Sequence, residues 1–284
     1  MAKNIGVVVK PDPHARRHAD DLERWLKARG HNVMRRPSDA DTPTVPRPGD
    51  EAAPADLSFV VVLGGDGTLL SAVRWLGDNQ VPILGIKFGE LGFLAEAGEE
   101  QIHMAVQAIL DNHFTTWPRM RLDVEVWRAG ERLAHEIVFN DVVINKGALA
   151  RLALIKTHID DRYLTDYRAD GLIVATPTGS TAYSLAAGGP IVHPAVEGIL
   201  LTPICPFTLT NRPLIVPESS RIKIQLAERS ADIVLTFDGQ VGLAIDESHT
   251  ILMRKADRPV NLITLPERNF FDVLRTKLKW SGSR

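Results

Sequence analysis

One stretch, the apolar run Phe59–Leu63 followed by Gly64-Gly65-Asp66-Gly67-Thr68, constrains the fold of this chain more than any other. The apolar run predicts a short buried strand, and from Thr68 onward apolar residues recur at helical spacing through Leu69, Val73 and Leu76. A strand, a glycine-rich turn and a helix N-terminus bring backbone N–H groups together at the positive end of the helix dipole. Glycines let a phosphate approach the backbone closely. The stretch therefore predicts a phosphate loop that includes Gly64, Gly65 and Thr68.

Asp66 is the unexpected residue of this loop, because a phosphate repels a carboxylate. Two roles would explain its presence: holding a magnesium ion, or taking a proton from an attacking hydroxyl group. The alternative is a simple type I′ or type II turn, in which Asp-Gly is a common pair.

Strands and helices alternate in the first part of the sequence. This alternation predicts an α/β domain with a doubly wound, mostly parallel sheet, whose ligands bind at the carboxyl ends of its strands. The expected elements are strands at 5–9, 32–34, 59–63 and 82–86 and helices at 15–29 and 101–110. Residues 37–55 contain five prolines among acidic and small residues, so we expect a mobile loop there that does not belong to the core.

The pattern changes after Trp117-Pro118, because apolar residues then alternate with polar ones from Arg121 and Ala129-Gly130 resembles a hairpin turn. Short strands separated by turn residues predict an all-β, sandwich-like domain. The further strand candidates are 137–144, 152–157, 171–175, 221–226, 232–237 and 250–254. We therefore expect an α/β domain at 1–118, joined by the tail 266–284, and a β-rich domain at 119–265. The tail, helical from Asn269 to Trp280, is expected to return to the first domain.

Asn140 and Asp141 interrupt the apolar run Ile137–Ile144, where burying them is costly unless they are hydrogen-bonded. A carboxylate beside an amide suits a vicinal diol, since it accepts from the hydroxyl groups while the amide donates to them. Ribose binding and a plain turn or bulge between two short strands both remain open from this pair alone.

A second polar cluster follows, in which Arg168 and Asp170 precede a strand and the hydroxyl-rich segment Thr176–Pro190 comes after it. Its small and hydroxyl residues predict a polar ligand at the N-terminus of a short helix. Asp238-Gly239-Gln240 is most simply a hairpin turn.

Composition excludes several classes of protein. The 284 residues are 44% hydrophobic and 24% charged with a net charge of −2, so nothing attracts the chain to nucleic acid in general. No apolar window is long enough for a membrane span and no signal peptide precedes the first strand, so a cytoplasmic location is expected. The single cysteine, Cys205, is expected to be a buried, inert thiol. The nine histidines show no zinc-protease spacing.

Together these motifs resemble the bacterial NAD kinases, over nearly the whole chain. The resemblance depends on Gly64–Thr68, Asn140-Asp141, Asp170-Gly171 leading into Thr176–Pro190, and the ending from Phe270 to Trp280. It implies transfer of the ATP γ-phosphate to the 2′-hydroxyl of the adenosine ribose of NAD, which gives NADP. It also implies magnesium, the two-domain fold, and a homodimer or homotetramer.

The resemblance further assigns roles to residues. Asp66 would be the base for the 2′-hydroxyl, with Gly67 beside it, while Asn140 and Asp141 would hold the ribose. Arg151, Arg168 and Asp170 would lie near the pyrophosphate and the nicotinamide. The adenine and ribose pocket would be lined by Thr181, Ala182, Tyr183, Ser184, Leu185 and Ala186, with Gln240 closing one side. Two positions depart from the family pattern: Ala186 where serine is frequent and Phe207 where histidine is frequent.

Two other functions remain as alternatives. A lipid kinase of the diacylglycerol or sphingosine type shares the glycine-rich loop, but no basic amphipathic helix indicates a membrane-facing surface. A non-catalytic NAD-binding sensor would not need Asp66. An oxidoreductase is disfavoured, because Val8-Val9-Lys10-Pro11 stands where the dinucleotide fold carries its glycine fingerprint.

Overall fold

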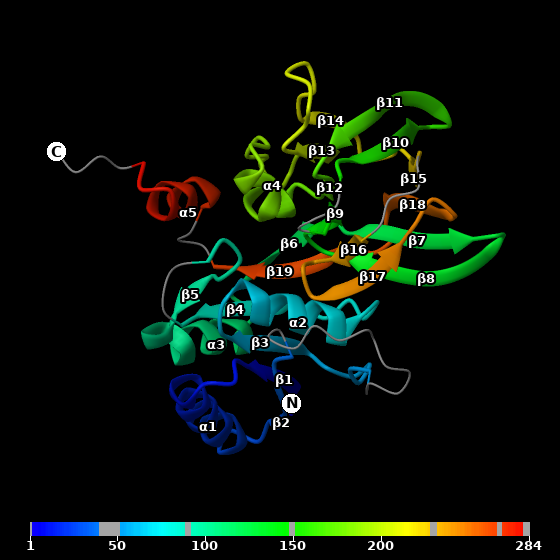
Figure 1. Cartoon of the computed structure of the whole chain (residues 1–284). Coiled ribbons are helices and arrows are strands. Elements are labelled where there is room, and N and C mark those ends of the chain that lie inside the picture. The colour runs from blue at the N-terminus through cyan, green and yellow to red at the C-terminus, as the bar shows by residue number, and fades with distance from the viewer. Residues whose placement is uncertain are drawn as a thin grey trace. The chain divides into compact units, whose positions relative to one another are not determined.

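The computed structural model of this chain describes residues 2–39, 52–88, 92–147, 151–227, 232–265 and 269–280 (Figure 1). The described residues divide into two compact units: unit 1 holds those up to 118 and from 260 onward, and unit 2 holds 119–259. Of the predicted proline-rich loop, residues 40–51 lie outside the described residues, whereas Pro37 ends a strand and Ala53 is buried.

Unit 1 is built on a largely parallel sheet, as the sequence predicts. The strands have the order β2-β1-β3-β4-β19-β6, and β5 pairs with β4. They are β1 (Asn4–Val9), β2 (Asn32–Pro37), β3 (Phe59–Leu63), β4 (Ile83–Lys87), β5 (Ala97–Gly98), β6 (Thr115–Arg119) and β19 (Val260–Thr264). The pairs β1–β2, β1–β3, β3–β4, β4–β5 and β4–β19 are all parallel. Residues 260–265, which the sequence pattern places with the β-rich domain, therefore contribute a strand to this sheet.

Helices cover both faces of the unit 1 sheet. One face packs against α1 (Pro13–Lys27) and α3 (Ile102–Leu110), whose buried residues form a single apolar cluster with alternate residues of β1 and β3. The other face packs against α2 (Asp66–Leu76), since Trp75 of α2 lies against Gly6 of β1. The 3-10 helix η1 (Glu99–Gln101) precedes α3, and α5 (Phe270–Lys277) is the predicted C-terminal helix, which belongs to unit 1.

Unit 2 consists of two antiparallel sheets. The first has the order β11-β10-β15-β18-β7-β8, and the second has the order β14-β13-β12-β9-β16-β17. The first sheet contains β7 (Leu122–Arg128), β8 (Glu131–Val138), β10 (Ala153–Ile159), β11 (Arg162–Ala169), β15 (Ile222–Leu226) and β18 (His249–Lys255). The second contains β9 (Asp141–Lys146), β12 (Gly171–Ala175), β13 (Gly198–Ile204), β14 (Leu214–Pro217), β16 (Ile233–Phe237) and β17 (Val241–Ile245).

The two sheets of unit 2 form a sandwich. One apolar cluster joins alternate residues of both sheets, for example Val124 and Ile224 of the first with Ile144 and Leu172 of the second. The outer face of the second sheet is also buried, because Ile173 of β12 belongs to another cluster with Val192. The all-β sandwich expected for this region is therefore confirmed, and the segment 176–192 packs on its outer face.

Two local expectations were wrong. The predicted strand Ile137–Ile144 is two strands: β8 ends at Val138 and pairs with β7, whereas β9 begins at Asp141 and pairs with β12 and β16. Its polar pair lies where the chain crosses from one sheet to the other. Cys205 is exposed, with a φ of 45° just after β13, so it is not the buried thiol expected from its apolar neighbours. Trp117-Pro118, after which the sequence pattern changes, lies inside β6, at the end of the sheet order, where proline is tolerated.

Across the described ranges, no helix is long and apolar enough to span a bilayer.

Candidate functional site

The predicted phosphate loop joins β3 to α2. β3 ends at Leu63 and α2 begins at Asp66, so the helix starts two residues before Thr68, where the apolar spacing begins. Asp66 and Gly67 are the first residues of the helix, which rules out the alternative of a plain Asp-Gly turn. A Cβ at Gly64 would meet the Thr68 hydroxyl oxygen at 2.3 Å, so the loop is tight enough to require glycine there. N–H groups of a first helical turn have no acceptor within the helix and point toward any anion placed there.

The carboxylate of Asp66 is fixed by the backbone of a second loop. Its Oδ2 accepts a hydrogen bond from the N–H of Phe93 at 3.1 Å, and its Oδ1 accepts one from the N–H of Leu94 at 3.2 Å. A Cβ at Gly92 would lie 2.3 Å from Oδ1, so this close approach also requires glycine. Asp66 is therefore held in one orientation at the N-terminus of α2, near the carboxyl ends of β3 and β4.

In unit 2, the chain crossing at Phe139 and Asn140 is held by Asp238, the first residue of the β16–β17 turn. The Asp238 carboxylate accepts from the backbone N–H groups of Phe139 at 2.9 Å, Asn140 at 2.6 Å and Asp141 at 3.2 Å. Asp238 and Gly239 have φ angles of 50° and 64°, as a type I′ hairpin requires. The predicted turn is therefore present, and it also shapes the candidate site.

Asn140 and Asp141 present unusual polar groups. The Oδ1 atom of Asn140 is buried, and no described residue donates a hydrogen bond to it. The Asp141 side chain is buried as well, and burial together with the nearby Asp238 charge raises its pKa from 3.8 to about 7, although the Tyr183 N–H group partly opposes the rise. A buried acceptor beside a carboxyl group that changes charge near neutral pH is typical of a ligand site.

Both residues line a cavity of about 480 Å³ within unit 2. Ala182 and Tyr183 border it on one side, and Lys146 and Asp238 also contribute to its wall. Tyr183 opens α4 (Tyr183–Ala186), a short helix that follows the 3-10 helix η2 (Thr178–Thr181). The structure thus brings together Asn140, Asp141, Ala182 and Tyr183, four of the predicted site residues.

The hydroxyl groups of the segment 176–190 are mostly used within the protein, contrary to the expectation that they meet a ligand. Thr176 donates to the Phe139 carbonyl at 2.7 Å, and Thr181 donates to the Thr178 carbonyl at 3.2 Å. Ser180 accepts from the Val192 N–H at 3.0 Å, and Ser184 lies 2.9 Å from the Thr202 hydroxyl. These bonds fix the segment on the outer face of the sheet, which in turn positions Ala182 and Tyr183. Leu185 is partly buried, and Ala186 is exposed.

The predicted arginines lie at a second cavity of unit 2, also of about 480 Å³, lined by Arg151, Arg168, Leu152 and Leu154. The Arg168 guanidinium lies 4.8 Å from the centre of the Phe207 ring, a cation–π contact at one of the two unusual positions. Asp170 forms an ion pair with Lys146 at 3.4 Å. Gln240 is buried in the β16–β17 turn, next to the cavity residue Gly239.

Sequence reasoning missed two charged side chains of the first cavity, Asp238 and Lys146. Asp238 gave no local signal, because Asp-Gly is an ordinary pair in a type I′ turn. Lys146 gave no signal, because a lysine at the end of a strand is ordinarily exposed.

Comparison with known proteins identifies the family. Residues 5–114 match the model of the ATP-NAD kinase N-terminal domain, and residues 139–265 match that of the ATP-NAD kinase C-terminal domain. The NAD kinase of Desulfatibacillum aliphaticivorans is 52% identical over 282 residues, which cover 99% of each chain. The NAD kinase of Geobacter sulfurreducens is 45% identical over 284 residues, covering 98% of this chain and 99% of its own.

Solved structures agree with the sequence comparison. The yeast NADH kinase complexed with NADH superposes with a TM-score of 0.86 at 28% identity, over 100% of this chain and 89% of its own. The NAD kinase from Archaeoglobus fulgidus in complex with ATP superposes with a TM-score of 0.76 at 25% identity, over 96% of this chain and 99% of its own. By both domain matches and full-length identity, the chain belongs to the ATP-NAD kinase family.

Proposed function

We propose that this chain is an NAD kinase, which transfers the γ-phosphate of ATP to the 2′-hydroxyl of the adenosine ribose of NAD. The hydroxyl oxygen attacks the γ-phosphorus, the bond to the β,γ-bridging oxygen breaks, and the products are NADP and ADP. The relatives named above support both substrates, since one is complexed with NADH and another with ATP.

The buried Oδ1 atom of Asn140, without a described donor and beside Asp141, carries the proposal. A lone acceptor in a cavity costs free energy until a ligand donates to it. The hydroxyl groups of a ribose supply such donors, and the Asp141 carboxyl can accept or donate according to its protonation.

Asp66 is proposed as the base that accepts the proton of the 2′-hydroxyl. Both of its oxygens are held by backbone N–H groups, yet each retains a lone pair that can receive a proton. Phosphoryl transfer demands mainly positioning and charge stabilisation, so a fixed carboxylate and an N–H-lined loop suit it. Gly64, Gly65 and Thr68 form that loop, with Gly67 beside the base.

The remaining predicted residues are proposed to bind the rest of NAD. Arg151 and Arg168 place two positive charges at one cavity, which suits the pyrophosphate, and Asp170 is proposed near the nicotinamide. Ala182 and Tyr183 border the adenine and ribose pocket, whereas Thr181, Ser184, Leu185 and Ala186 support it from the adjoining turns. Gln240 is proposed to close one side. In this division, unit 1 supplies the phosphate loop and unit 2 binds NAD.

The residues present fit a magnesium ion delivered with ATP. Mg²⁺ is usually held by one or two carboxylates together with substrate phosphates and water, and Asp66 offers a carboxylate beside a phosphate loop. When bound, the ion would neutralise charge on the transferred phosphate. We also propose a homodimer or homotetramer, which analytical ultracentrifugation tests directly.

A coupled assay tests the function. Purified protein is mixed with NAD, ATP and magnesium, and NADP is detected with an NADP-specific dehydrogenase. Product should form only when NAD and ATP are both present, and a diacylglycerol acceptor should not be phosphorylated. NAD binding without turnover would indicate a sensor, and phosphorylation of the lipid would indicate a lipid kinase; either result would overturn the proposal.

A further inference from the structure

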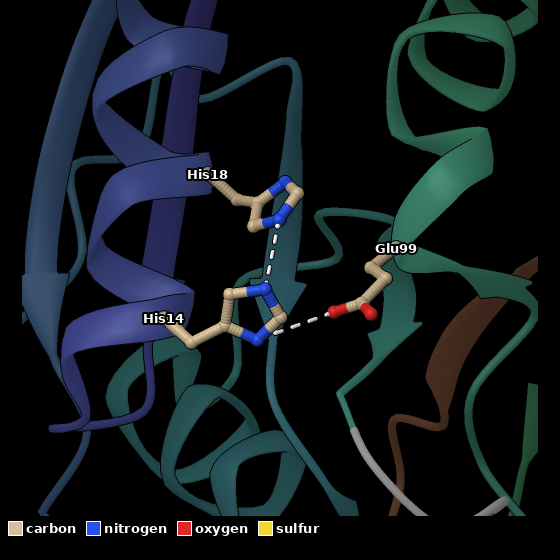
Figure 2. Close-up of side chains that lie close together, drawn as sticks. All are labelled: His14, His18 and Glu99. Atoms are coloured by element: carbon tan, nitrogen blue, oxygen red, sulfur yellow. Dashed lines mark hydrogen bonds and ion pairs between the residues drawn. The ribbon is translucent and has the colours of Figure 1, made fainter.

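Two histidines on α1 point ring nitrogens toward each other. His14 and His18 lie one turn apart on the same side of the helix, whose start is fixed because Asp12 accepts from the N–H of His14 and of Ala15 (Figure 2). Their Nε2 atoms are 3.3 Å apart. Two neutral imidazoles can share only one proton across this gap, and two protonated rings would repel each other.

Glu99 joins this histidine pair from another element. It lies in η1, directly after β5, and its Oε2 is 3.5 Å from Nδ1 of His14 (Figure 2). The Oε2 atom is buried, and no hydrogen-bond donor reaches it from the part of the chain that the structure describes. One ligand atom from each of His14, His18 and Glu99 can be chosen so that all lie within 4.8 Å of one another.

We propose that His14, His18 and Glu99 form a binding site for a divalent transition-metal ion of the zinc type. In a tetrahedral zinc site with Zn–N bonds of about 2.0–2.1 Å, two imidazole nitrogens are separated by about 3.3–3.4 Å. The two Nε2 atoms already have this separation. Nitrogen ligands with a carboxylate favour Zn²⁺, Co²⁺ or Ni²⁺ over Mg²⁺, which prefers oxygen. The site is therefore different in chemistry from a magnesium site at Asp66.

Each residue has a distinct role in the proposed site. The Nε2 atoms of both histidines would bind the ion. Glu99 Oε2, now without a donor among the described residues and 3.5 Å from Nδ1 of His14, would then accept from that Nδ1–H, which fixes the tautomer and orients the ring. The Phe88 ring packs edge-on to both imidazoles, with centroid distances of 5.6 Å to His14 and 5.2 Å to His18. His14 retains 51% exposure of its side chain, so water completes the coordination and the ion has an open path.

The position of the cluster suggests what the ion would do. His14 follows β1, Phe88 follows β4 and Glu99 follows β5, so these three residues lie near the carboxyl ends of parallel strands of the unit 1 sheet, in which β3 lies between β1 and β4. The ion would link α1 to η1 across that edge. Because an ion that binds only the folded state stabilises it, the link should raise the melting temperature of the protein.

The test measures binding of zinc chloride to the full-length protein by calorimetry and the change in its melting temperature. At about a hundredfold excess over Kd, zinc should raise Tm by about 5 °C. Cobalt chloride serves as a spectroscopic probe, because Co²⁺ bound by imidazoles in a tetrahedral site gives d–d absorption bands. The variants are His18→Ala and Glu99→Gln, and the matched control is His103→Ala, since His103 is a similarly exposed histidine of unit 1 that pairs with Asp21 at 3.2 Å.

The wild-type protein and the His103→Ala variant should bind one more zinc ion than His18→Ala does. Glu99→Gln should keep the stoichiometry and weaken the affinity by about 10–100-fold. If His18→Ala destabilises the folded protein, His18→Gln is used in its place. It keeps a side chain of similar length but has no metal-binding nitrogen. Equal zinc binding and equal cobalt spectra in wild type and both His18 variants would overturn the proposal, as would absence of binding by the wild type.

Discussion

Asp238 holds Asn140 in place: the Asp238 Oδ1 atom accepts a hydrogen bond from the Asn140 backbone N–H at 2.6 Å. The two residues are 98 positions apart in the sequence, one in a hairpin turn and the other where the chain crosses between the sheets of the sandwich. The same carboxylate binds the N–H groups of Phe139 and Asp141. A turn residue therefore sets the geometry of the proposed ribose site.

Replacing Asp238 with asparagine tests this relationship. Asparagine keeps one acceptor oxygen but turns an NH₂ group toward backbone N–H donors, so we expect Asp238→Asn to lower the free energy of unfolding by about 1–3 kcal/mol. NAD affinity should fall as well. Urea denaturation and calorimetry measure the two effects. The matched control is Asp160→Asn, another turn aspartate with positive φ, which accepts from the Arg221 N–H at 2.8 Å. Equal losses of NAD affinity in both variants would contradict the special role of Asp238.

Gly179 should tolerate no side chain. A Cβ there would lie 2.1 Å from the Asn140 carbonyl oxygen, a backbone atom that cannot move aside cheaply. We expect Gly179→Ala to cost about 1–3 kcal/mol or more of stability and to displace Asn140. Gly242→Ala is the control, because a Cβ at that position has its nearest neighbour at 3.7 Å. Thermal denaturation of the two variants decides the matter, and similar melting temperatures would refute the proposed contact.

The sequence predicted the elements whose residues follow one local pattern. The strand at 59–63 and the strand at 171–175 have the predicted bounds. A short, uninterrupted apolar run between turn residues is compatible with few structures other than a buried strand. The sequence also indicated that burying Asn140 and Asp141 in an apolar run costs free energy, because this cost arises in any fold. The change of sheet at this pair could not be predicted, since it depends on strand pairing with β12 and β16, far away in the sequence.

The part of the site that sequence reasoning missed depends on tertiary contacts. Nothing local distinguishes Asp238 from an ordinary turn residue, because its three hydrogen bonds reach residues about a hundred positions away. Ser180 and Ser184 show the converse: their hydroxyl groups favoured a ligand in the sequence but bond to the protein itself. Local chemistry gives the types of residue at a site, and packing decides which of them remain available to a ligand.

Asp141 should make stability depend on pH. Its pKa is about 7 in the folded protein and 3.8 as the ordinary value, so between these values the unfolded chain binds fewer protons than the folded one. The free energy of unfolding should therefore fall as pH rises from about 4 to 7, by a few kcal/mol in order of magnitude. Asp141→Asn removes this titration. Urea denaturation at pH 5, 6, 7 and 8 should show the variant gaining stability relative to wild type as pH rises to 7. A constant difference would contradict the burial argument.

Asn140→Ala should weaken NAD binding more than ATP binding. The variant removes the buried Oδ1 acceptor that we assign to a ribose hydroxyl of NAD, whereas the phosphate loop at Gly64–Thr68 is unchanged. A lost hydrogen bond of this kind corresponds to about 0.5–1.5 kcal/mol, or roughly 2–10-fold in Kd. Calorimetry with each nucleotide separately gives the comparison, and circular dichroism confirms folding. Equal losses for the two nucleotides would count against the ribose assignment.

Asp66→Asn gives the sharpest test of the proposed chemistry. Without the base, turnover should fall by roughly 10²–10⁴-fold, while NAD still binds through unit 2. Asparagine has one acceptor for the N–H groups of Phe93 and Leu94, so part of the loss could come from a disturbed loop. Gly92→Ala measures that part, because its Cβ would push against Asp66 without removing the carboxylate. We expect the loss in Asp66→Asn to exceed the loss in Gly92→Ala.

Magnesium dependence separates the two roles considered for Asp66. If Asp66 held the metal ion, raising magnesium should recover part of the activity of Asp66→Asn, since an amide oxygen is a weaker ligand than a carboxylate. If Asp66 is the base, added magnesium cannot restore a missing proton acceptor, and kcat should stay low at saturating metal. Full recovery at high magnesium would reassign Asp66 as a metal ligand. If Asp66→Asn kept a near-wild-type kcat at the ordinary magnesium concentration, Asp66 would have no part in the mechanism. Its hydrogen bonds to Phe93 and Leu94 would then be its only function.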